Sequence, residues 1–338
     1  MPVVSVIVPN YNHARFLPQR LQSIFDQTFQ DFEVILLDDC SSDNSREILE
    51  QYRNHPKVSV VLFNEINSGS TFKQWGKGIG LSTGDYIWIA ESDDYCENTF
   101  LNELVAKLDE FPTAGIAYCQ SVSVNTENKF LSNWIEHTDV FNPNIWDDDF
   151  QISGDAAIRN YLLYRNIIPN TSAVVFRKSV FKKTSGININ FSLNGDWLLW
   201  INILKYSDLV FVAKNLNFFR QHSNKATISN TANYKGLREM LDLFCYIQDD
   251  FHITKAEKKT MTELALKRWI YQFIHCSYIT SIKNIPVISK HAYKFNTKYY
   301  LYFIHAVFDL TVLFFQRKLF LNKTLVLITP PKNPDKYR

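Results

Sequence analysis

Short apolar runs alternate with helical patterns along the first two thirds of the chain. The runs typical of buried strands span residues 3–8, 32–37, 58–63, 86–90, 116–119, 172–176 and 209–213. Between the first two runs, the apolar positions from residue 16 to residue 25 recur at helical spacing. Strands that alternate with helices in this way predict an α/β fold with a doubly wound, mainly parallel sheet. After residue 232 the strand signals fade, so a C-terminal helical region is expected.

The fourth of these runs, Tyr86–Ala90, ends in concentrated negative charge. Glu91, Asp93 and Asp94 follow it, at the carboxyl end of a strand, where open α/β sheets bind their ligands. Because side chains alternate along an extended chain, residues 91 and 93 project to the same side. Two carboxylates on one side suit a hard divalent cation, which could in turn hold a diphosphate. The alternative is a solvated acidic turn that caps a helix beginning near Asn98.

The glycine-rich segment Gly76-Lys77-Gly78-Ile79-Gly80 matches neither of two common phosphate-binding patterns. It lacks the Gly-Lys-Ser/Thr ending of a P-loop, and it precedes a predicted strand, whereas a dinucleotide fingerprint follows one. The sequence therefore favours flexible packing around a helix for these glycines.

Composition narrows the class of protein. A length of 338 residues predicts one large α/β domain with a C-terminal appendage. The formal charge of +2 is almost balanced and indicates no nucleic-acid partner. The five cysteines are odd in number and far apart, which argues against a disulfide framework or a zinc site and favours a reduced cytosol. The strand-like N-terminus lacks the basic leader and long apolar core of a signal peptide.

The last part of the chain is basic and aromatic. Residues 283–338 contain ten Lys or Arg and only two acids, so this tail is expected to face an anionic surface. The apolar run 299–315 includes His305 and Asp309, and it is too short and interrupted to predict a transmembrane span. A packed helix and an interfacial helix both remain open for this run.

Several ordered motifs resemble those of the inverting family 2 glycosyltransferases, whose catalytic domain has the GT-A fold. The resemblance covers residues 2–228 and leaves the remainder uncovered. It implies a GT-A type, Rossmann-like mixed sheet for residues 1–228. Residues 229–338 are expected to form a helical membrane-surface or oligomerisation element. The matching segments are VIVPNYN (6–12), LDDCSSD (37–43), NSG (67–69), GDYI (84–87), ESDD (91–94), GDW (195–197) and FRQH (219–222).

The resemblance implies a nucleotide site at the ends of the first two strands. Pro9 and Tyr11 match positions whose main chain and aromatic ring hold the nucleotide base, with an ordinary turn as the alternative. Asp39 matches the aspartate that accepts the N3–H of uracil or thymine, a donor that cytosine lacks. A helix cap is the alternative for Asp39. These matches imply a UDP- or dTDP-sugar donor.

The family's Asp-x-Asp signature corresponds to Glu91-Ser92-Asp93, with glutamate in place of the first aspartate. By resemblance, Asp93 ligates a divalent metal, Mg²⁺ or Mn²⁺, which bridges the diphosphate and stabilises the leaving group. Glu91 and Asp94 are expected at the donor site, where Asp94 orients the loop or the sugar.

Three further residues match functional positions of the family. Inversion needs a carboxylate that deprotonates the acceptor hydroxyl, and Asp196 matches that base, with helix capping as the alternative. Arg220 and His222 match a loop that closes over the diphosphate, where guanidinium suits phosphate and imidazole can complete a metal shell. The alternative is that Arg220 and His222 are ordinary solvated side chains at the surface. The chain departs from the family at Gly195, where many members have Glu, and at Gln74-Trp75-Gly76, where many have Ala-Arg-Asn.

The sequence thus predicts an inverting, metal-dependent glycosyltransferase of cell-surface polysaccharide synthesis, with a glycan or lipid-linked oligosaccharide as acceptor. It is expected in the cytoplasm, where the basic tail would place it at the inner face of the plasma membrane. A sugar nucleotidyltransferase is one rival, although residues 9–13 lack its glycine- and arginine-rich phosphate loop. A non-catalytic glycan-binding or scaffold protein is the other, motivated by Glu91 and Gly195. The sugar, the linkage and the oligomeric state stay open.

Overall fold

The computed structural model describes residues 2–139, 141, 144–168, 170–222, 234–275 and 278–304. The chain divides into two compact units, one formed by residues 1–162 and 166–222 and the other by residues 163–165 and 223–338. The predicted domain boundary at residue 228 lies outside the described residues.

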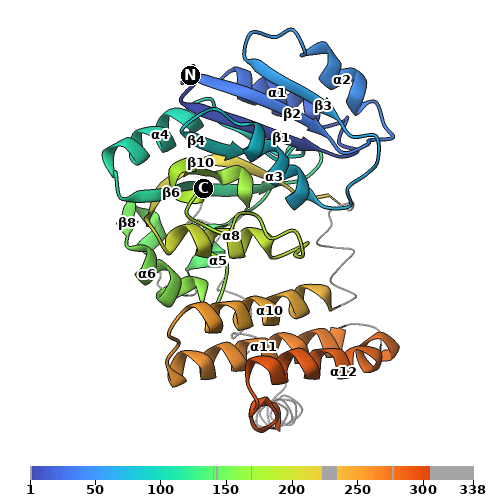
Figure 1. Cartoon of the computed structure of the whole chain (residues 1–338), viewed down its shortest axis with the longest axis vertical. Helices are drawn as coiled ribbons and strands as arrows, with labels where there is room; N and C mark the ends of the chain where they lie inside the picture. The colour runs from blue at the N-terminus through green and yellow to red at the C-terminus, as the bar shows by residue number, and fades with distance from the viewer. Residues whose placement is uncertain are drawn as a thin grey trace. The chain divides into compact units, whose positions relative to one another are not determined.

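The first unit is built on one ten-stranded sheet flanked by helices (Figure 1). The strand order is β3-β2-β1-β4-β9-β6-β10-β5, with β7 beside β6 and β8 beside β10. The strands are β1 (Val4–Asn10), β2 (Phe32–Asp38), β3 (Val58–Phe63), β4 (Tyr86–Ile89), β5 (Tyr95–Cys96), β6 (Ala114–Val124), β7 (Phe130–Asn133), β8 (Phe150–Ile152), β9 (Val174–Arg177) and β10 (Asp208–Arg220). The helices are α1 (Leu17–Phe25), α2 (Ser45–Gln51), α3 (Thr71–Leu81), α4 (Phe100–Glu110), α5 (Ile135–Thr138), α6 (Gly154–Ala157), α7 (Lys178–Phe181) and α8 (Gly195–Leu204).

Most of the long strands run in one direction. β1 pairs in parallel with β2 and β4, β2 pairs in parallel with β3, and β6 pairs in parallel with β10. Between these two sets lies β9, which is antiparallel to both β4 and β6. The predicted mixed, mainly parallel α/β sheet is therefore confirmed.

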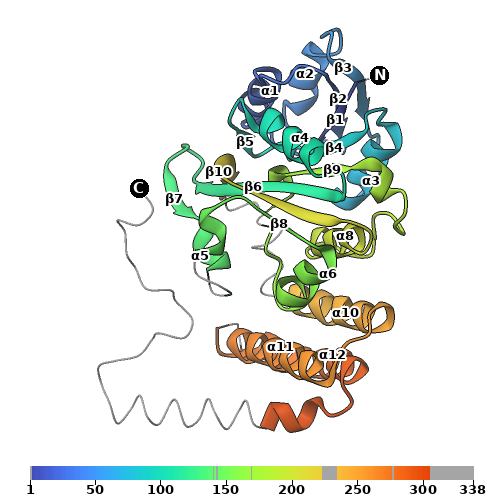
Figure 2. The same cartoon turned by 90° about the vertical axis from the view of Figure 1, so that its left-hand side faces the viewer.

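Alternation along β1 explains which helices cover which face of the sheet. Val4, Val6 and Val8 are buried in a core shared with α1, α2 and α4. Ile7 points to the opposite face, where it lies against Gly78 of α3. Figure 2 shows α1, α2 and α4 on one side of the strands and α3 on the other. The sheet is thus covered on both faces, as its continuous apolar strands require.

The polar segment 121–151, in which the sequence predicts no strand, contains regular structure. β6 runs well beyond its predicted end, and β7 and β8 follow it. The prediction is wrong here because the end of β6 carries polar residues whose buried side chains are hydrogen-bonded. Ser121 Oγ accepts from Asn217 Nδ2 at 2.9 Å, and Ser123 Oγ accepts from Trp134 Nε1 at 2.9 Å. Polar strand residues with such partners escape a search for apolar runs.

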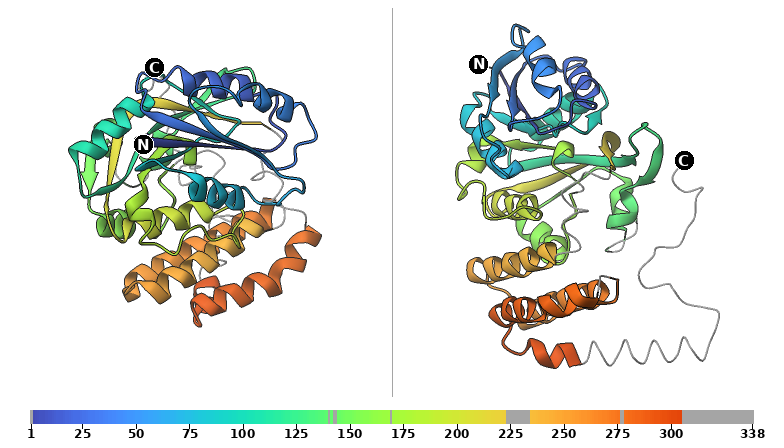
Figure 3. Two further views of the ribbon diagram at one scale, coloured as in Figure 1. Left: turned by 45° about the horizontal axis from the view of Figure 1, so that its top comes forward. Right: turned by 90° about the vertical axis from the view of Figure 1, so that its right-hand side faces the viewer.

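The second unit is helical, which confirms the predicted C-terminal helical region (Figure 3). Its helices α10 (Lys235–Asp250), α11 (Lys255–His275) and α12 (Tyr278–Phe295) pack against one another. Residues 299–304 are also helical, and the rest of the apolar run 299–315 lies outside the described residues. In the described ranges, no helix has the length and apolar character needed to cross a membrane.

Gly78 marks a close approach of α3 to β1 and gives a test of this packing. A Cβ atom on Gly78 would lie 2.3 Å from Cγ2 of buried Ile7, whereas one on Gly76 would meet nothing within 4 Å. We expect Gly78→Ala to lower the free energy of unfolding by about 1–3 kcal/mol, as overpacking does. The control Gly76→Ala should raise it by about 0.5–1 kcal/mol, because alanine is favoured in an exposed helix interior. Urea denaturation measures both, and equal effects of the two variants would contradict the packing.

Candidate active site

Several predicted site residues lie at one edge of the sheet. β1, β2 and β4 are parallel neighbours, so their carboxyl ends lie side by side, and Tyr11, Asp39 and Glu91 follow these ends. Pro9 is buried within β1, whereas Tyr11 exposes 48% of its surface. An aromatic ring at the ligand-binding edge is therefore open to stack on a planar base.

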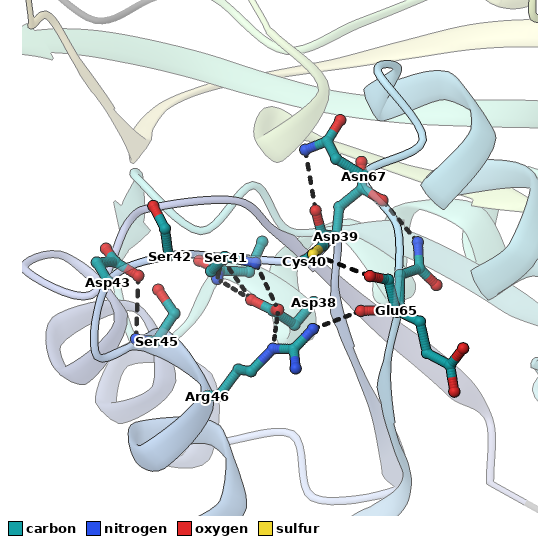
Figure 4. A network of polar contacts seen from close by, with 12 residues as sticks. Asp38, Asp39, Cys40, Ser41, Ser42, Asp43, Ser45, Arg46, Glu65 and Asn67 are labelled. Atoms are coloured by element: carbon teal, nitrogen blue, oxygen red, sulfur yellow. Dashed lines mark hydrogen bonds and ion pairs between the residues drawn. The ribbon is translucent and has the colours of Figure 1, made fainter.

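Asp39 is buried and held by donors from the loop and helix that follow β3. Figure 4 shows Asn67 of that loop, whose side chain donates to the main-chain carbonyl of Asp39 at 2.9 Å. Asp39 Oδ1 accepts from Asn64 Nδ2 at 2.6 Å and from Gln74 Nε2 at 2.8 Å. Ser68 donates its main-chain N–H to Oδ1 at 2.9 Å and its hydroxyl to Oδ2 at 2.7 Å. Asp39 is therefore not a helix cap, and the N-cap of the next helix, α2, is Asn44. Among the described residues Oδ2 accepts from one donor, which leaves it capacity for another, such as a base N–H.

The neighbouring Asp38 binds the loop and helix that follow β2 (Figure 4). It is fully buried, accepts from the main-chain N–H of Ser41 at 2.9 Å and pairs with Arg46 at 3.2 Å. In the loop after β1, Asn12 Oδ1 accepts from the main-chain N–H of Ser42 at 2.7 Å. The two loops that carry the predicted base-binding residues are thereby fixed to each other.

His13, Asp93 and His222 come together beyond the end of β4. Nε2 of His222 lies 2.9 Å from Oδ2 of Asp93, and one ligand atom from each of the three side chains lies within 4.8 Å of the others. Nδ1 of His13 lies 2.8 Å from Ser92 Oγ, which fixes the ring. The motifs predicted Asp93 and His222 but missed His13. Its position shortly after β1, whose end meets that of β4, is the signal that could have revealed it.

This three-residue cluster fits a divalent cation. It offers two imidazoles and one carboxylate, and Asp93 is largely buried. Imidazole ligates transition metals, whereas Mg²⁺ takes oxygen ligands, so the mixed set suits Mn²⁺ better than Mg²⁺.

Two buried arginines hold the main chain of residues 91–94, which we call the acidic loop. Arg20 Nε donates to the carbonyl oxygen of Glu91 at 2.9 Å, and Arg220 Nε donates to that of Asp93 at 2.8 Å. Both side chains are almost entirely buried, at 0% and 1% exposure. They place positive charge beside the carboxylates of the loop and offset the repulsion among them.

Arg220 and Asp94 are bound mainly to the protein itself. Arg220 donates from Nη1 to Asn128 Oδ1 at 2.6 Å and from Nη2 to Gln19 Oε1 at 2.8 Å. Asp94 accepts from the main-chain N–H of Arg220 at 3.0 Å and from Asn170 Nδ2 at 2.8 Å. These bonds favour a positioning role for both residues. Their predicted contacts with diphosphate and sugar stay predictions.

Glu91 is bound to α3. Its Oε1 accepts from the indole Nε1–H of buried Trp75 at 2.7 Å, and among the described residues it does not belong to the three-residue cluster. Burial and the charges of Asp93 and Asp94 raise the pKa of Glu91 to about 8, against the opposing effects of Trp75 and Arg20. Near neutral pH, without a cation, this side chain is therefore largely protonated.

The departures from the family pattern are connected in space. Trp75, at the position where many relatives have arginine, binds Glu91, and its ring meets Phe72 edge-on at 4.7 Å between centroids. A Cβ atom on Gly195 would lie 2.6 Å from the ring of Phe72. The ring of Phe72 thus occupies the space that a side chain at position 195 would need.

Asp196 lies in the first turn of α8, where an acidic side chain is favoured by the helix dipole. The N-cap of this helix is Asn194, so Asp196 does not fill the capping position. Its Oδ2 accepts from Asn166 Nδ2 at 3.0 Å, and the side chain is half-buried. An oriented, partly accessible carboxylate can accept a proton, but the role as catalytic base stays a prediction.

Glu91 provides a test of the bond to α3. Glu91→Ala leaves the buried indole N–H of Trp75 without its acceptor, and we expect it to lower the free energy of unfolding by about 1–3 kcal/mol. Glu91→Gln keeps an acceptor for the indole N–H and is neutral, as the protonated Glu91 is, so it should be about as stable as the native protein near neutral pH. Urea denaturation without added metal measures the free energy of unfolding of both variants. An equal decrease in both would contradict a stabilising role for the bond between Trp75 and Glu91.

His13 provides a test of the metal site. We expect the protein to bind Mn²⁺ more tightly than Mg²⁺, and His13→Ala to weaken Mn²⁺ binding by roughly tenfold or more. His55→Ala is the matched control, because this imidazole packs on Phe25 at 4.0 Å and lies outside the cluster. Calorimetric titration of the metal alone measures each affinity. Native-like Mn²⁺ binding by His13→Ala would contradict the assignment.

Known proteins share both the sequence and the fold of this chain. Poly(ribitol-phosphate) beta-N-acetylglucosaminyltransferase TarS of Staphylococcus aureus is 36% identical over 108 residues, which cover 31% of this chain and 19% of TarS. Glycosyltransferase GlyG of Streptococcus pneumoniae is 35% identical over 108 residues, which cover 32% of this chain and 36% of GlyG. The chain therefore matches only about a fifth to a third of the length of these relatives.

Two kinds of solved structure support the fold. TarS residues 1–349 in complex with UDP-GlcNAc superpose with a TM-score of 0.61 at 19% identity, covering 80% of this chain and 72% of that one. Mannosyltransferase PcManGT from Pyrobaculum calidifontis, in complex with GDP-Man and Mn²⁺, superposes with a TM-score of 0.53 at 13% identity, covering 95% and 88%.

The family model described as Glycosyl transferase family 2 matches residues 5–184, more than half of the chain. This segment carries Tyr11, His13, Asp39 and the acidic loop, whereas Asp196, Arg220 and His222 lie beyond it. The chain belongs to the family 2 glycosyl transferases.

Proposed function

We propose that this protein transfers a sugar from a UDP- or dTDP-sugar to a hydroxyl group of a glycan, with inversion at the anomeric carbon. The observation that carries this proposal is the cluster of His13, Asp93 and His222 at the sheet edge that also presents Asp39 and Tyr11. A diphosphate site and a base site side by side are what a nucleotide-sugar donor requires. The family match favours sugar transfer over the rival of a nucleotidyltransferase.

The donor nucleotide is recognised by Asp39 and Tyr11. Asp39 Oδ2 accepts the N3–H of uracil or thymine while Oδ1 stays bound to the loop after β3, and the exposed Tyr11 ring packs on the base. Cytosine has no N3–H to donate, so Asp39 discriminates against it. UDP is the first candidate because TarS, a relative in sequence, was solved with UDP-GlcNAc.

The diphosphate is held at the three-residue cluster. Mn²⁺ bound there would neutralise charge on the leaving nucleoside diphosphate. Asp93 and the two imidazoles supply the protein ligands, and Arg20 and Arg220 keep the acidic loop in place. Because Glu91 is pinned to Trp75, it contributes to the shape of the donor site rather than to the metal shell.

Asp196 acts as the general base. Its carboxylate accepts the proton of the acceptor hydroxyl as that oxygen bonds to the anomeric carbon and the bond to the diphosphate breaks. Asn166 orients the carboxylate by donating to Oδ2. Attack from the side opposite the leaving group inverts the anomeric configuration.

We further propose an oligosaccharide, free or lipid-linked, as the acceptor, and the cytoplasmic side of the cell envelope as the place of action. Support comes from TarS, which by its name modifies poly(ribitol phosphate).

Asp196→Asn tests the base. The variant keeps an acceptor for Asn166 but cannot take the proton, so turnover should fall by about 10²–10⁴-fold while donor affinity stays unchanged. Asp155→Asn, in the first turn of α6, is the matched control and should be fully active. The assay follows release of UDP or dTDP from a panel of nucleotide sugars with oligosaccharide acceptors. Native turnover by Asp196→Asn would contradict the assignment.

A further inference from the structure

One face of the C-terminal helical unit combines exposed apolar side chains with lysines. On α12, Ile282 and Tyr293 are 44% and 57% exposed, and Pro286 between them is also exposed. These positions lie at i, i+4 and i+11 and therefore share one face of the helix. The short helical stretch 299–304 that follows also carries exposed apolar side chains, those of Tyr300, Leu301 and Ile304.

The opposite side of α12 is where it packs into its own unit. Ile288, Ala292 and Phe295 recur at i, i+4 and i+7, are buried, and line the same small void as Leu241 of α10. The exposed apolar residues are therefore not displaced members of that core.

The charge of this region is entirely positive. Residues 278–304 contain no Asp or Glu, and their four lysines, Lys283, Lys290, Lys294 and Lys298, are all exposed. The first three lie at i, i+7 and i+11, so they form a row beside the apolar one. Asp242 of α10 contacts α12, but it is paired with His291 at 2.8 Å.

We propose that the basic apolar face of α12, formed by Ile282, Lys283, Pro286, Lys290, Tyr293 and Lys294, binds the surface of a bilayer that contains anionic phospholipids. The apolar and aromatic side chains enter the boundary between headgroups and acyl chains, and the lysines contact lipid phosphates. This inference does not rest on the proposed sugar transfer.

The exposure and charge of this face favour a lipid surface over the packed helix and the oligomerisation element that the sequence left open. A packed helix would bury these side chains, yet they are exposed. A symmetric dimer through the same face would place lysine rows opposite one another with no acid of residues 278–304 to pair with them, and like charges across an interface are unfavourable. An anionic lipid surface satisfies both the apolar and the basic side chains.

The experiment is flotation of the purified full chain with vesicles of phosphatidylcholine alone or mixed with phosphatidylglycerol. We expect binding to the mixed vesicles that weakens as salt is raised, and little binding to neutral ones. Lys283→Gln combined with Lys290→Gln should reduce binding roughly thirtyfold, since each lysine near an anionic surface contributes about fivefold. Lys255→Gln with Lys259→Gln, exposed on α11, makes the same charge change and should leave binding unaltered.

A second variant tests the apolar part without changing charge. Ile282→Ser with Tyr293→Ser should also weaken vesicle binding, and circular dichroism checks that the variants keep their helices. Equal losses in the α12 and α11 lysine pairs, or no binding to mixed vesicles, would overturn the proposal. Sedimentation without lipid should give a monomer, whereas a dimer abolished by Ile282→Ser would identify the face as a self-association surface instead.

Discussion

The negative charges of Asp93 and Asp94 oppose the ionisation of Glu91 in the same loop, and the candidate site is arranged to offset this repulsion. Arg20 and Arg220, from α1 and the end of β10, each donate to a main-chain carbonyl of the acidic loop. These two bonds hold the backbone of the loop in place without a bound cation. Preorganisation of this kind lowers the cost of ordering the site when the donor binds. The remaining contacts, including the bond of Asp94 to Asn170, support this fixed loop.

Helix α3 contacts three parts of the candidate site: Asp39, the acidic loop and Gly195. Within its first two turns, Gln74 binds Asp39, Trp75 binds Glu91, and Phe72 fills the space beside Gly195. A change in this helix would therefore shift Asp39 and the acidic loop together. This explains how the chain departs from the family pattern at several positions while it keeps a connected site.

The apolar runs predicted the parallel strands and their helices, because these strands are buried on both faces and need continuous hydrophobic sequence. Ordered motifs predicted Asp93 and His222. His13 and Arg20 were missed, because their significance depends on contacts with residues far away in the chain, such as the 71 residues that separate Arg20 from Glu91. The end of β6 was missed because its polar residues find partners only in the folded sheet.

The central claim is that the acidic loop and Asp39 form one metal-dependent site for a uridine or thymidine diphosphate. Calorimetric titration with UDP and GDP, with and without Mn²⁺, on the native protein and on Asp93→Ala tests it most directly. The account predicts UDP binding that Mn²⁺ strengthens, that GDP does not match, and that loses its metal dependence in the variant. GDP binding as tight as UDP, or Mn²⁺-dependent UDP binding that survives in Asp93→Ala, would contradict it.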